Sequence, residues 1–319
     1  MTRRDGSGKG CAPSSSFPGS GRGASRLIAS LLLLVCGAAG PAEDKARPLL
    51  WNARADKQNC PLSSDAVWVD YARGQDCIRY FSGGDVERAP VAIVIFHGDR
   101  SGLIGRRPED IHGNTAREQE AIAERTAQRV GLPVLVVARP GTYGSSGNHF
   151  RRRQPSEFLA LNAALDEIRA RYRIGWFVLL GHSGGATAAA ALLTMGRRDI
   201  VCAVLTSGAF SLLERARIVS EEEGRAVQPG LDLTGLPSPY DPLDHVEGIV
   251  RDPARMVLVI GNEKDRVTPF PLQKKFADAL RRQGHRVRLI DHAALAPDYH
   301  DLKDSIGLAM AARCARGGA

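Results

Sequence analysis

The sequence predicts an α/β protein in which a mainly parallel sheet is flanked by helices. Short apolar runs alternate with stretches of helical period from residue 66 onward, which is the pattern of strands joined by crossover helices. The runs are nearly continuous in Val, Ile and Leu, as strands buried on both faces must be. With 319 residues and 43% hydrophobic content, the chain is also long enough to bury a large core.

The first two expected strands read as a hairpin at the edge of the sheet. They cover residues 66–72 and 76–83 and are separated by Arg73, Gly74 and Gln75, a spacing typical of antiparallel neighbours. The later apolar runs supply the remaining strands, at 91–98, 132–140, 176–183, 200–208, 255–265 and 286–292.

The segments between the strands have the signals of helices. Helical spacing is found in 115–130, 155–172, 184–196, 269–284 and 301–314. Pro155 and Pro269 stand where a first helical turn tolerates proline. Gly131, Gly196 and Gly284 stand where a helix commonly ends.

Residues 209–254 interrupt this alternation. An amphipathic piece, 211–226, is followed by the proline-rich stretch 229–245. The segment is too short for an independent domain and long enough for a partial cover, so we expect a lid-like insertion over a site. We therefore expect residues 43–319 to form a single domain.

The N-terminal 42 residues read as a signal peptide. Arg26 precedes an apolar run at 27–40, and the small residues Pro41 and Ala42 follow it, which is the order of a secretory signal. A membrane anchor is the alternative, but a spanning helix needs roughly 20 apolar residues. We expect an exported protein, periplasmic or secreted, with no stable membrane insertion after signal removal.

The charge of the chain excludes one class of partner. The formal net charge is +8, and the leader carries five basic side chains and one acidic one, which leaves +4 on the rest. No dense basic block with interleaved aromatic residues is present, and the run 151–153 is typical of a solvated loop. We expect no nucleic-acid partner.

Four cysteines follow the leader. Cys60 and Cys77 flank a strand-like segment at a span that a bridge could close, so we expect them to form a disulfide. Cys202 lies in an apolar run and is expected to be a buried small hydrophobic residue. The spacings are unlike those of metal ligands.

A single serine stands between a strand-like run and a run rich in glycine and alanine. Residues Gly181 to Gly185 have the sequence GHSGG, which fills the pattern G-x-S-x-G of a nucleophile held on a sharp strand-to-helix turn. Ser183 is therefore the candidate nucleophile, and a glycine-rich turn with a serine cap is the alternative. A nucleophilic serine also needs a histidine base and a carboxylate.

With this motif in place, residues 64 to 316 resemble the α/β-hydrolase family. The resemblance implies the chain order nucleophile, acid, histidine. Gly261, Asp265 and Pro269 match the family's G-x-x-x-D-x-x-x-P turn, so Asp265 is the expected acid. The expected base is His300, which precedes the last helix; His292, at the end of the last strand, is the alternative.

The resemblance also implies an oxyanion hole made of backbone N–H groups. One belongs to Gly184, and the other belongs to Asp99, which follows a His-Gly motif at 97–98. Asp99 is a departure, because the family more often has glycine or an apolar residue there. A carboxylate would repel a developing oxyanion, so we expect the Asp99 side chain to point away. We expect 139–147 to support the pocket.

These observations predict an exported serine hydrolase that cleaves ester or amide bonds through Ser183, His300 and Asp265. Residues 240–246, the 269–283 helix and the late histidine look most like prolyl-oligopeptidase-type and dienelactone-type hydrolases. A serine peptidase of the first type is therefore one alternative, and a non-catalytic binding protein with the hydrolase fold is another.

The resemblance and the residues also bear on ligands. A transferase or haloperoxidase-like activity on the same triad is a third possibility. The expected partner is a small-molecule ester or a short peptide. No cofactor and no metal are implied, because the dinucleotide fingerprint and clusters of metal ligands are missing. Loop arginines at 106–107 and 151–153 could attract an acidic acyl group.

Overall fold

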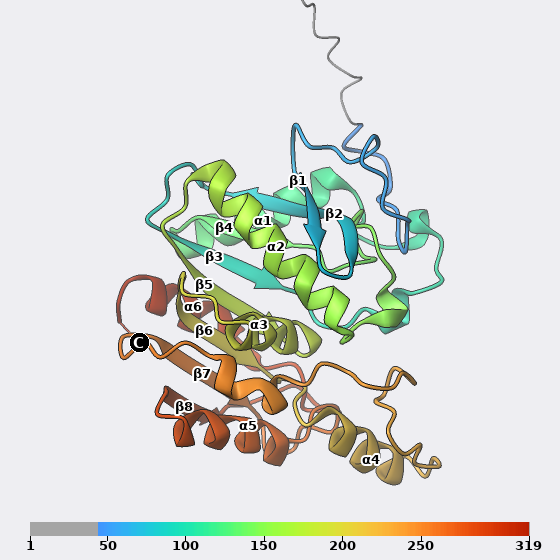
Figure 1. Cartoon of the computed structure of the whole chain (residues 1–319), viewed down its shortest axis with the longest axis vertical. Helices are drawn as coiled ribbons and strands as arrows, with labels where there is room; N and C mark the ends of the chain where they lie inside the picture. The colour runs from blue at the N-terminus through green and yellow to red at the C-terminus, as the bar shows by residue number, and fades with distance from the viewer. Residues whose placement is uncertain (1–43, 319) are drawn as a thin grey trace, which may run out of the picture. The chain divides into compact units, whose positions relative to one another are not determined.

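Eight strands form one sheet in the computed structural model, which describes residues 44–318 (Figure 1). The order across the sheet is β1-β2-β4-β3-β5-β6-β7-β8. The strands are β1 Ala66–Tyr71, β2 Gly74–Gly83, β3 Val91–Phe96, β4 Val134–Val137, β5 Trp176–His182, β6 Ile200–Thr206, β7 Met256–Gly261 and β8 Arg286–Asp291. β1 and β2 form the predicted antiparallel hairpin, β2 pairs antiparallel with β4, and all other neighbours are parallel.

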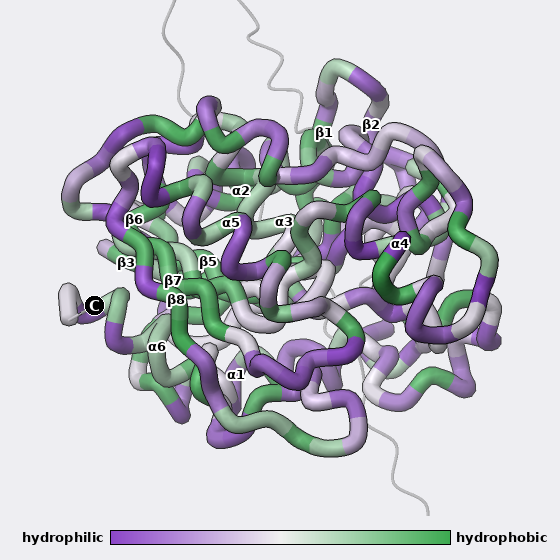
Figure 2. The backbone as a smooth tube through the Cα atoms, turned by 90° about the horizontal axis from the view of Figure 1, so that it is seen from below, coloured by the Kyte–Doolittle hydropathy of each residue, from purple (hydrophilic) through white to green (hydrophobic). Residues whose placement is uncertain are grey.

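Two layers of helices cover the sheet. One face packs against α2 (Pro155–Tyr172), α3 (Gly184–Thr194) and α5 (Phe270–Arg282). The other packs against α1 (Ala116–Val130) and α6 (Ile306–Ala315). Figure 2 shows the hydrophobic central strands lying between these two layers. The near-continuous apolar composition of the strands is explained by burial on both faces.

The helix boundaries follow local signals in the sequence. The Thr115 hydroxyl accepts the N–H of Glu118 and caps α1, and Gly131 ends the helix with a φ of 63°, a conformation that glycine adopts without steric cost. α6 begins at Ile306 instead of near 301. Asp304 and Ser305 take positive φ values of 59° and 50°, so residues 303–305 form a separate 3-10 turn.

The remaining elements are short. α4 (Leu212–Glu222) lies in the 209–254 insertion, which also contains a 3-10 helix at Pro242–Gly248. Further 3-10 turns cover Ser101–Leu103, Pro108–Asp110 and His149–Arg151. Residues 44–318 belong to one compact unit.

Two disulfides join distant segments of the described chain. Cys60 is bonded to Cys77 of β2, with a Cα–Cα distance of 5.7 Å, and this is the pair expected from the sequence. Cys202 is bonded to Cys314, which joins β6 to α6. Cys202 is buried as expected, and its pairing with Cys314 was not predicted from the sequence. The two cysteines are 112 residues apart, and only the packing of α6 on β6 brings them together.

Removing the Cys60–Cys77 bond is expected to destabilise the fold. The bond closes a loop over a sequence separation of 17 residues, for which chain entropy predicts a loss of about 3 kcal/mol in the free energy of unfolding. Guanidinium unfolding of the double variant Cys60→Ala, Cys77→Ala checks this against wild type. An unchanged midpoint would show that the bond does not restrain the unfolded chain.

None of the helices within residues 44–318 has both the length and the apolar character that crossing a membrane requires. The expected leader, residues 1–42, lies outside the described residues.

Candidate active site

Ser183 occupies a strained turn between β5 and α3. Its φ of 55° and ψ of −123° are unusual for a residue with a Cβ, and such strain persists only where the surroundings enforce it. Its N–H donates to the Thr206 carbonyl at 2.9 Å, and its own carbonyl accepts the N–H of Ala186 at 3.0 Å. The turn therefore holds the serine at the carboxyl end of β5, where parallel sheets place ligands.

The glycines of the GHSGG motif are explained by close backbone contacts. A Cβ on Gly181 would lie 2.2 Å from the Gly185 carbonyl oxygen, and a Cβ on Gly185 would lie 2.2 Å from the Phe96 carbonyl oxygen. Gly98 approaches from the loop after β3, and a Cβ there would lie 3.2 Å from the Ser183 Cβ. The sequence thus packs the end of β3 directly against the turn that carries the serine.

Asp265 and His300 form a pair beside this turn. His300 Nδ1 lies 3.0 Å from Oδ2 and 3.2 Å from Oδ1 of Asp265. The Asp265 side chain has no exposed surface, whereas that of His300 is 14% exposed. Because Nδ1 must carry a hydrogen to bond a carboxylate, Nε2 of the neutral ring is left as an acceptor.

The acid is held by its own turn. The N–H groups of Val267 and Thr268 donate to Asp265 Oδ1 at 2.9 and 2.8 Å, and the Thr268 hydroxyl donates to Oδ2 at 2.8 Å. The histidine is held by Ser207, whose hydroxyl donates to the His300 carbonyl at 2.7 Å. Sequence reasoning missed both supporting residues, although Thr268 lies inside the turn that identified Asp265.

The structure places only one of the two candidate bases on the acid. His292 follows β8, and its Nε2 lies 3.8 Å from Asp304. His300 instead shares one cavity with Ser183. No hydrogen bond joins Ser183 to His300 in the part of the chain described. Bonds of this kind are often long in unliganded enzymes.

His182 is a third histidine at the site that the sequence analysis did not single out. Its ring centroid lies 4.9 Å from that of His300. Burial, together with the charge of a protonated His300, lowers the pKa of His182 to about 4. At neutral pH His182 is therefore uncharged, so it does not repel a positive charge on His300.

The two backbone N–H groups expected to form an oxyanion hole have no partner in the described chain. They belong to Asp99 and Gly184, and neither donates to a protein acceptor within residues 44–318. Two histidines support the loop that carries Asp99. His97 Nδ1 donates to the Gly98 carbonyl at 2.7 Å, and His149 Nε2 accepts the N–H of Arg100 at 3.3 Å.

The Asp99 side chain is held by three arginines. Its carboxylate lies 2.9 Å from Arg139 Nη1 and 3.2 Å from Arg152 Nε, and it also bonds Arg153. Burial opposes ionisation of Asp99, but the charges of Arg153, Arg139 and Arg152 outweigh it and hold its pKa well below the usual range. The carboxylate still lies against Gly184, since a Cβ there would be 2.0 Å from Asp99 Oδ1.

These contacts revise the expectation for this residue. The carboxylate stays next to the proposed oxyanion hole and does not turn away from it, but its charge is compensated. Arg139 is fully buried and also bonds Glu157. The loop arginines at 152 and 153 thus bind an internal carboxylate, and the exposed Arg107 pairs with Asp110. Sequence reasoning could not find this cluster because its members are spread over the chain.

The segment 139–147 supports the site as expected. The Thr142 hydroxyl lies 3.0 Å from His97 Nε2. Ser145 and Ser146 are buried, and their hydroxyls accept the N–H groups of Arg79 and Cys77 on β2. The segment, which is the loop after β4, is therefore bonded to both β2 and the His-Gly loop.

The 209–254 insertion contacts residues that support the site. None of its residues lines the cavity that contains Ser183, so the structure does not place it as the expected lid. The buried Arg215 of α4 donates to the Val267 carbonyl at 2.8 Å, and burial lowers its pKa to about 10. Asp232 accepts a bond from Arg153 at 3.1 Å. The insertion thus braces the acid turn and the arginines that hold Asp99.

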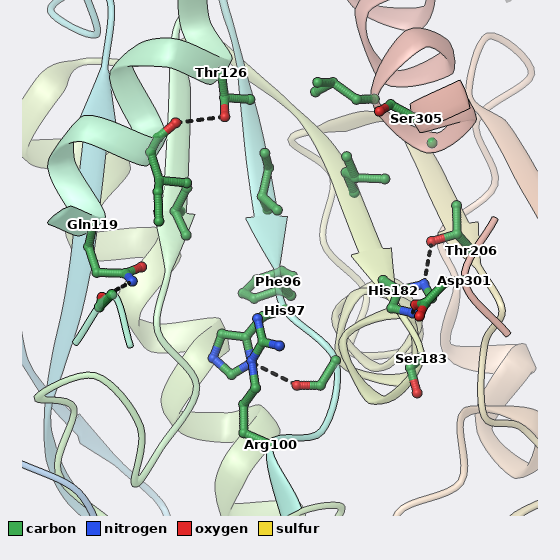
Figure 3. Close-up of a pocket in the computed structure, with 18 of the residues that line it drawn as sticks. Phe96, His97, Arg100, Gln119, Thr126, His182, Ser183, Thr206, Asp301 and Ser305 are labelled. Carbon is green, nitrogen blue, oxygen red and sulfur yellow. Dashed lines mark hydrogen bonds and ion pairs between the residues drawn. The ribbon is translucent and has the colours of Figure 1, made fainter. Parts of the chain in front are cut away.

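A cavity of 790 Å³ opens at Ser183. Figure 3 shows Ser183 and His182 at the end of their strand, with Arg100 on the loop that faces them. The guanidinium of Arg100 has no hydrogen-bond or ion-pair partner among residues 44–318, and its Nε is buried. In the same range no group of three or more His, Cys, Asp or Glu side chains could hold a metal ion.

Comparison with known proteins finds similar structures but no similar sequences. No family model matches the chain, and no curated protein matches its sequence. Among solved structures, Pyrococcus horikoshii acylaminoacyl peptidase is similar with a TM-score of 0.51 and 16% identity, covering 77% of this chain and 39% of the peptidase. Prolyl oligopeptidase B from Galerina marginata is similar with a TM-score of 0.54 and 17% identity, covering 79% of this chain and 36% of the other.

An esterase of similar length also matches. Est1E from Butyrivibrio proteoclasticus has a TM-score of 0.51 and 14% identity, covering 78% of this chain and 97% of the esterase. The chain thus spans well under half of the two peptidases and corresponds to nearly all of the esterase. These likenesses and the sheet order show that the chain has the α/β-hydrolase fold, as the sequence predicted.

Proposed function

We propose that this chain is a serine hydrolase that cleaves carboxylic esters through Ser183, His300 and Asp265. The observation that carries the proposal is the bond between Asp265 and His300, because His300 in turn lines one cavity with a serine on a strained strand-to-helix turn. A glycine-rich turn with a serine cap would require neither the strain nor the paired histidine.

The proposed reaction runs through an acyl-enzyme. Ser183 Oγ attacks the ester carbonyl carbon while its proton passes to His300 Nε2, and Asp265 stabilises the resulting imidazolium. The N–H groups of Gly184 and Asp99 bind the oxyanion. The carbon–oxygen bond to the leaving alcohol then breaks, and His300 returns the proton to that oxygen. Water attacks the acyl-enzyme by the same route, releasing the acid and restoring Ser183.

One observation favours esters over peptides as the proposed substrates. The match to Est1E, which has the name of an esterase, covers nearly the whole of that protein. Each of the two peptidases is more than twice as long as its matched part. Peptide cleavage is the second candidate, and it is supported by the names of those neighbours. A panel of p-nitrophenyl esters and peptide p-nitroanilides separates the two.

We also propose that the protein is exported, to the periplasm or beyond the cell. Two disulfides in the described chain support this, because such bonds persist mainly in oxidising compartments. The apolar run after Arg26 adds the sequence pattern of a secretory signal.

Labelling with a fluorophosphonate tests the activated serine directly. Wild type is expected to gain the mass of one adduct, since the reagent bonds to a nucleophilic serine. Ser183→Ala is expected to gain none. Ser63→Ala, which removes an exposed serine, is the matched control and is expected to label like wild type. A folded wild-type protein without an adduct would favour the non-catalytic binding protein.

A further inference from the structure

One part of the sheet is left partly uncovered between α1 and α6. Ile95 of β3 and Val136 of β4 lie on central parallel strands, yet both are only partly buried. Parallel strands of this kind are normally covered on both faces. The two helices lie on this face and flank the gap, which forms part of the cavity that opens at Ser183.

The exposed strip is a groove with apolar walls. Its floor is formed by Ile95, Val136 and Leu180, one wall by Ile122 of α1, and the other by Ile306, the first residue of α6, and by Leu302, which precedes the 3-10 turn before it. We call these six residues the α1–α6 groove. Ile122 is 37% exposed, and Ile95, Val136, Leu302 and Ile306 are partly buried. The groove therefore presents apolar surface to solvent, and such surface commonly marks a binding site.

The groove is continuous with the proposed catalytic residues and is closed at the end that lies away from them. Gln119 and Thr126 of α1 both line the cavity, and Figure 3 shows Thr126 above Gln119 on this helix. Seven residues of helix separate them, which corresponds to about 10 Å. Beyond Thr126, Arg129 Nη1 donates to Ser305 Oγ at 3.2 Å and connects the two walls.

We propose that the α1–α6 groove binds an extended hydrocarbon chain of the substrate, so that the enzyme prefers lipophilic esters to short ones. This inference rests on the proposed function. An unbranched chain fits because the groove is long, apolar and joined to the serine at one end. None of the six groove residues is charged; the charged side chains that line the same cavity include Arg100, Glu118, Arg125 and Asp301.

The test uses alkyl fluorophosphonates of increasing chain length, because they require only an activated serine. We expect the second-order rate constant for labelling wild type to rise by at least about tenfold from the methyl to the octyl reagent, since each buried methylene favours binding. Thr126→Trp, which fills the far end of the groove, is expected to abolish this rise. It should leave the methyl reagent within about twofold of wild type.

Two further variants separate an effect on the groove from a general effect of a bulky substitution on α1. Gln128→Trp places the same bulk on α1 at an exposed position outside the cavity, and it should behave like wild type. Ile122→Lys introduces a charge at the exposed wall and should also suppress the long-chain advantage. Reagents that carry the chain on phosphorus or on the alkoxy oxygen distinguish an acyl chain from an alcohol chain, and a rise in either series supports the groove.

The outcomes separate this inference from the proposed function. Labelling of Ser183 at one rate for all chain lengths would overturn the groove while leaving the hydrolase in place. A rise that survives in both Thr126→Trp and Ile122→Lys would overturn it as well, because the chain would then lie elsewhere. Failure of every reagent on folded protein would overturn the proposed function itself.

Discussion

Replacing His300 with alanine is expected to lower kcat for ester hydrolysis by roughly 10⁴-fold or more, the scale on which loss of a triad member acts. The bond from His300 Nδ1 to Asp265 leaves Nε2 of the neutral ring able to accept the Ser183 proton. Without it the hydroxyl is a weak nucleophile at neutral pH. Steady-state kinetics on the most reactive p-nitrophenyl ester measures the effect, with the unfolding midpoint checked in parallel.

His292→Ala is the matched control. Its ring lies beside Asp304 and not on Asp265, so its kcat is expected to stay within a few-fold of wild type. If both variants lost activity equally while remaining folded, His300 would not be the base. Loss in His292→Ala alone would move that role to the end of β8.

Replacing Asp99 with alanine is expected to destabilise the fold by about 3–5 kcal/mol, as removal of one partner of a buried ion pair does. Arg139, Arg152 and Arg153 all bond its carboxylate, and the first of these has no exposed surface. Urea unfolding at pH 7 measures the loss. Because the folded-state pKa of Asp99 lies below its ordinary value, the carboxylate's contribution is present above about pH 4 and declines in stronger acid.

An exposed ion pair gives the comparison for this prediction. Asp110 pairs with Arg107, and both side chains are largely exposed, so Asp110→Ala is expected to cost less than about 1 kcal/mol. Equal effects of the two substitutions would show that the arginines around Asp99 are solvated well enough to do without it.

The order of strands and helices could be predicted because burial imposes a pattern on neighbouring residues. Continuous apolar runs such as 256–261 mark strands covered on both faces, and capping residues such as Thr115 mark helix starts. The start of α6 was placed about five residues early, because its boundary depends on positive φ angles at Asp304 and Ser305 that no motif announces.

The candidate site could be predicted where its residues follow a strand, and less well where they meet only in space. Ser183 and Asp265 each stand in a local motif, and His300 precedes the last helix. The arginines around Asp99 come from the end of β4 and the loop before α2, so no spacing relates them. The bond between Cys202 and Cys314 was missed for the same reason.

The effect of the Cys202–Cys314 bond depends on the redox conditions around the protein. The bond fastens α6 to β6, and the start of α6 supplies one wall of the α1–α6 groove. Under oxidising conditions the C-terminal end of α6, eight residues beyond Ile306, cannot leave the sheet without moving a strand. In the reducing cytosol the same helix would be restrained by packing alone. The proposed groove is thereby connected, through the helix that forms one of its walls, to a bond that depends on the redox conditions in which the protein folds.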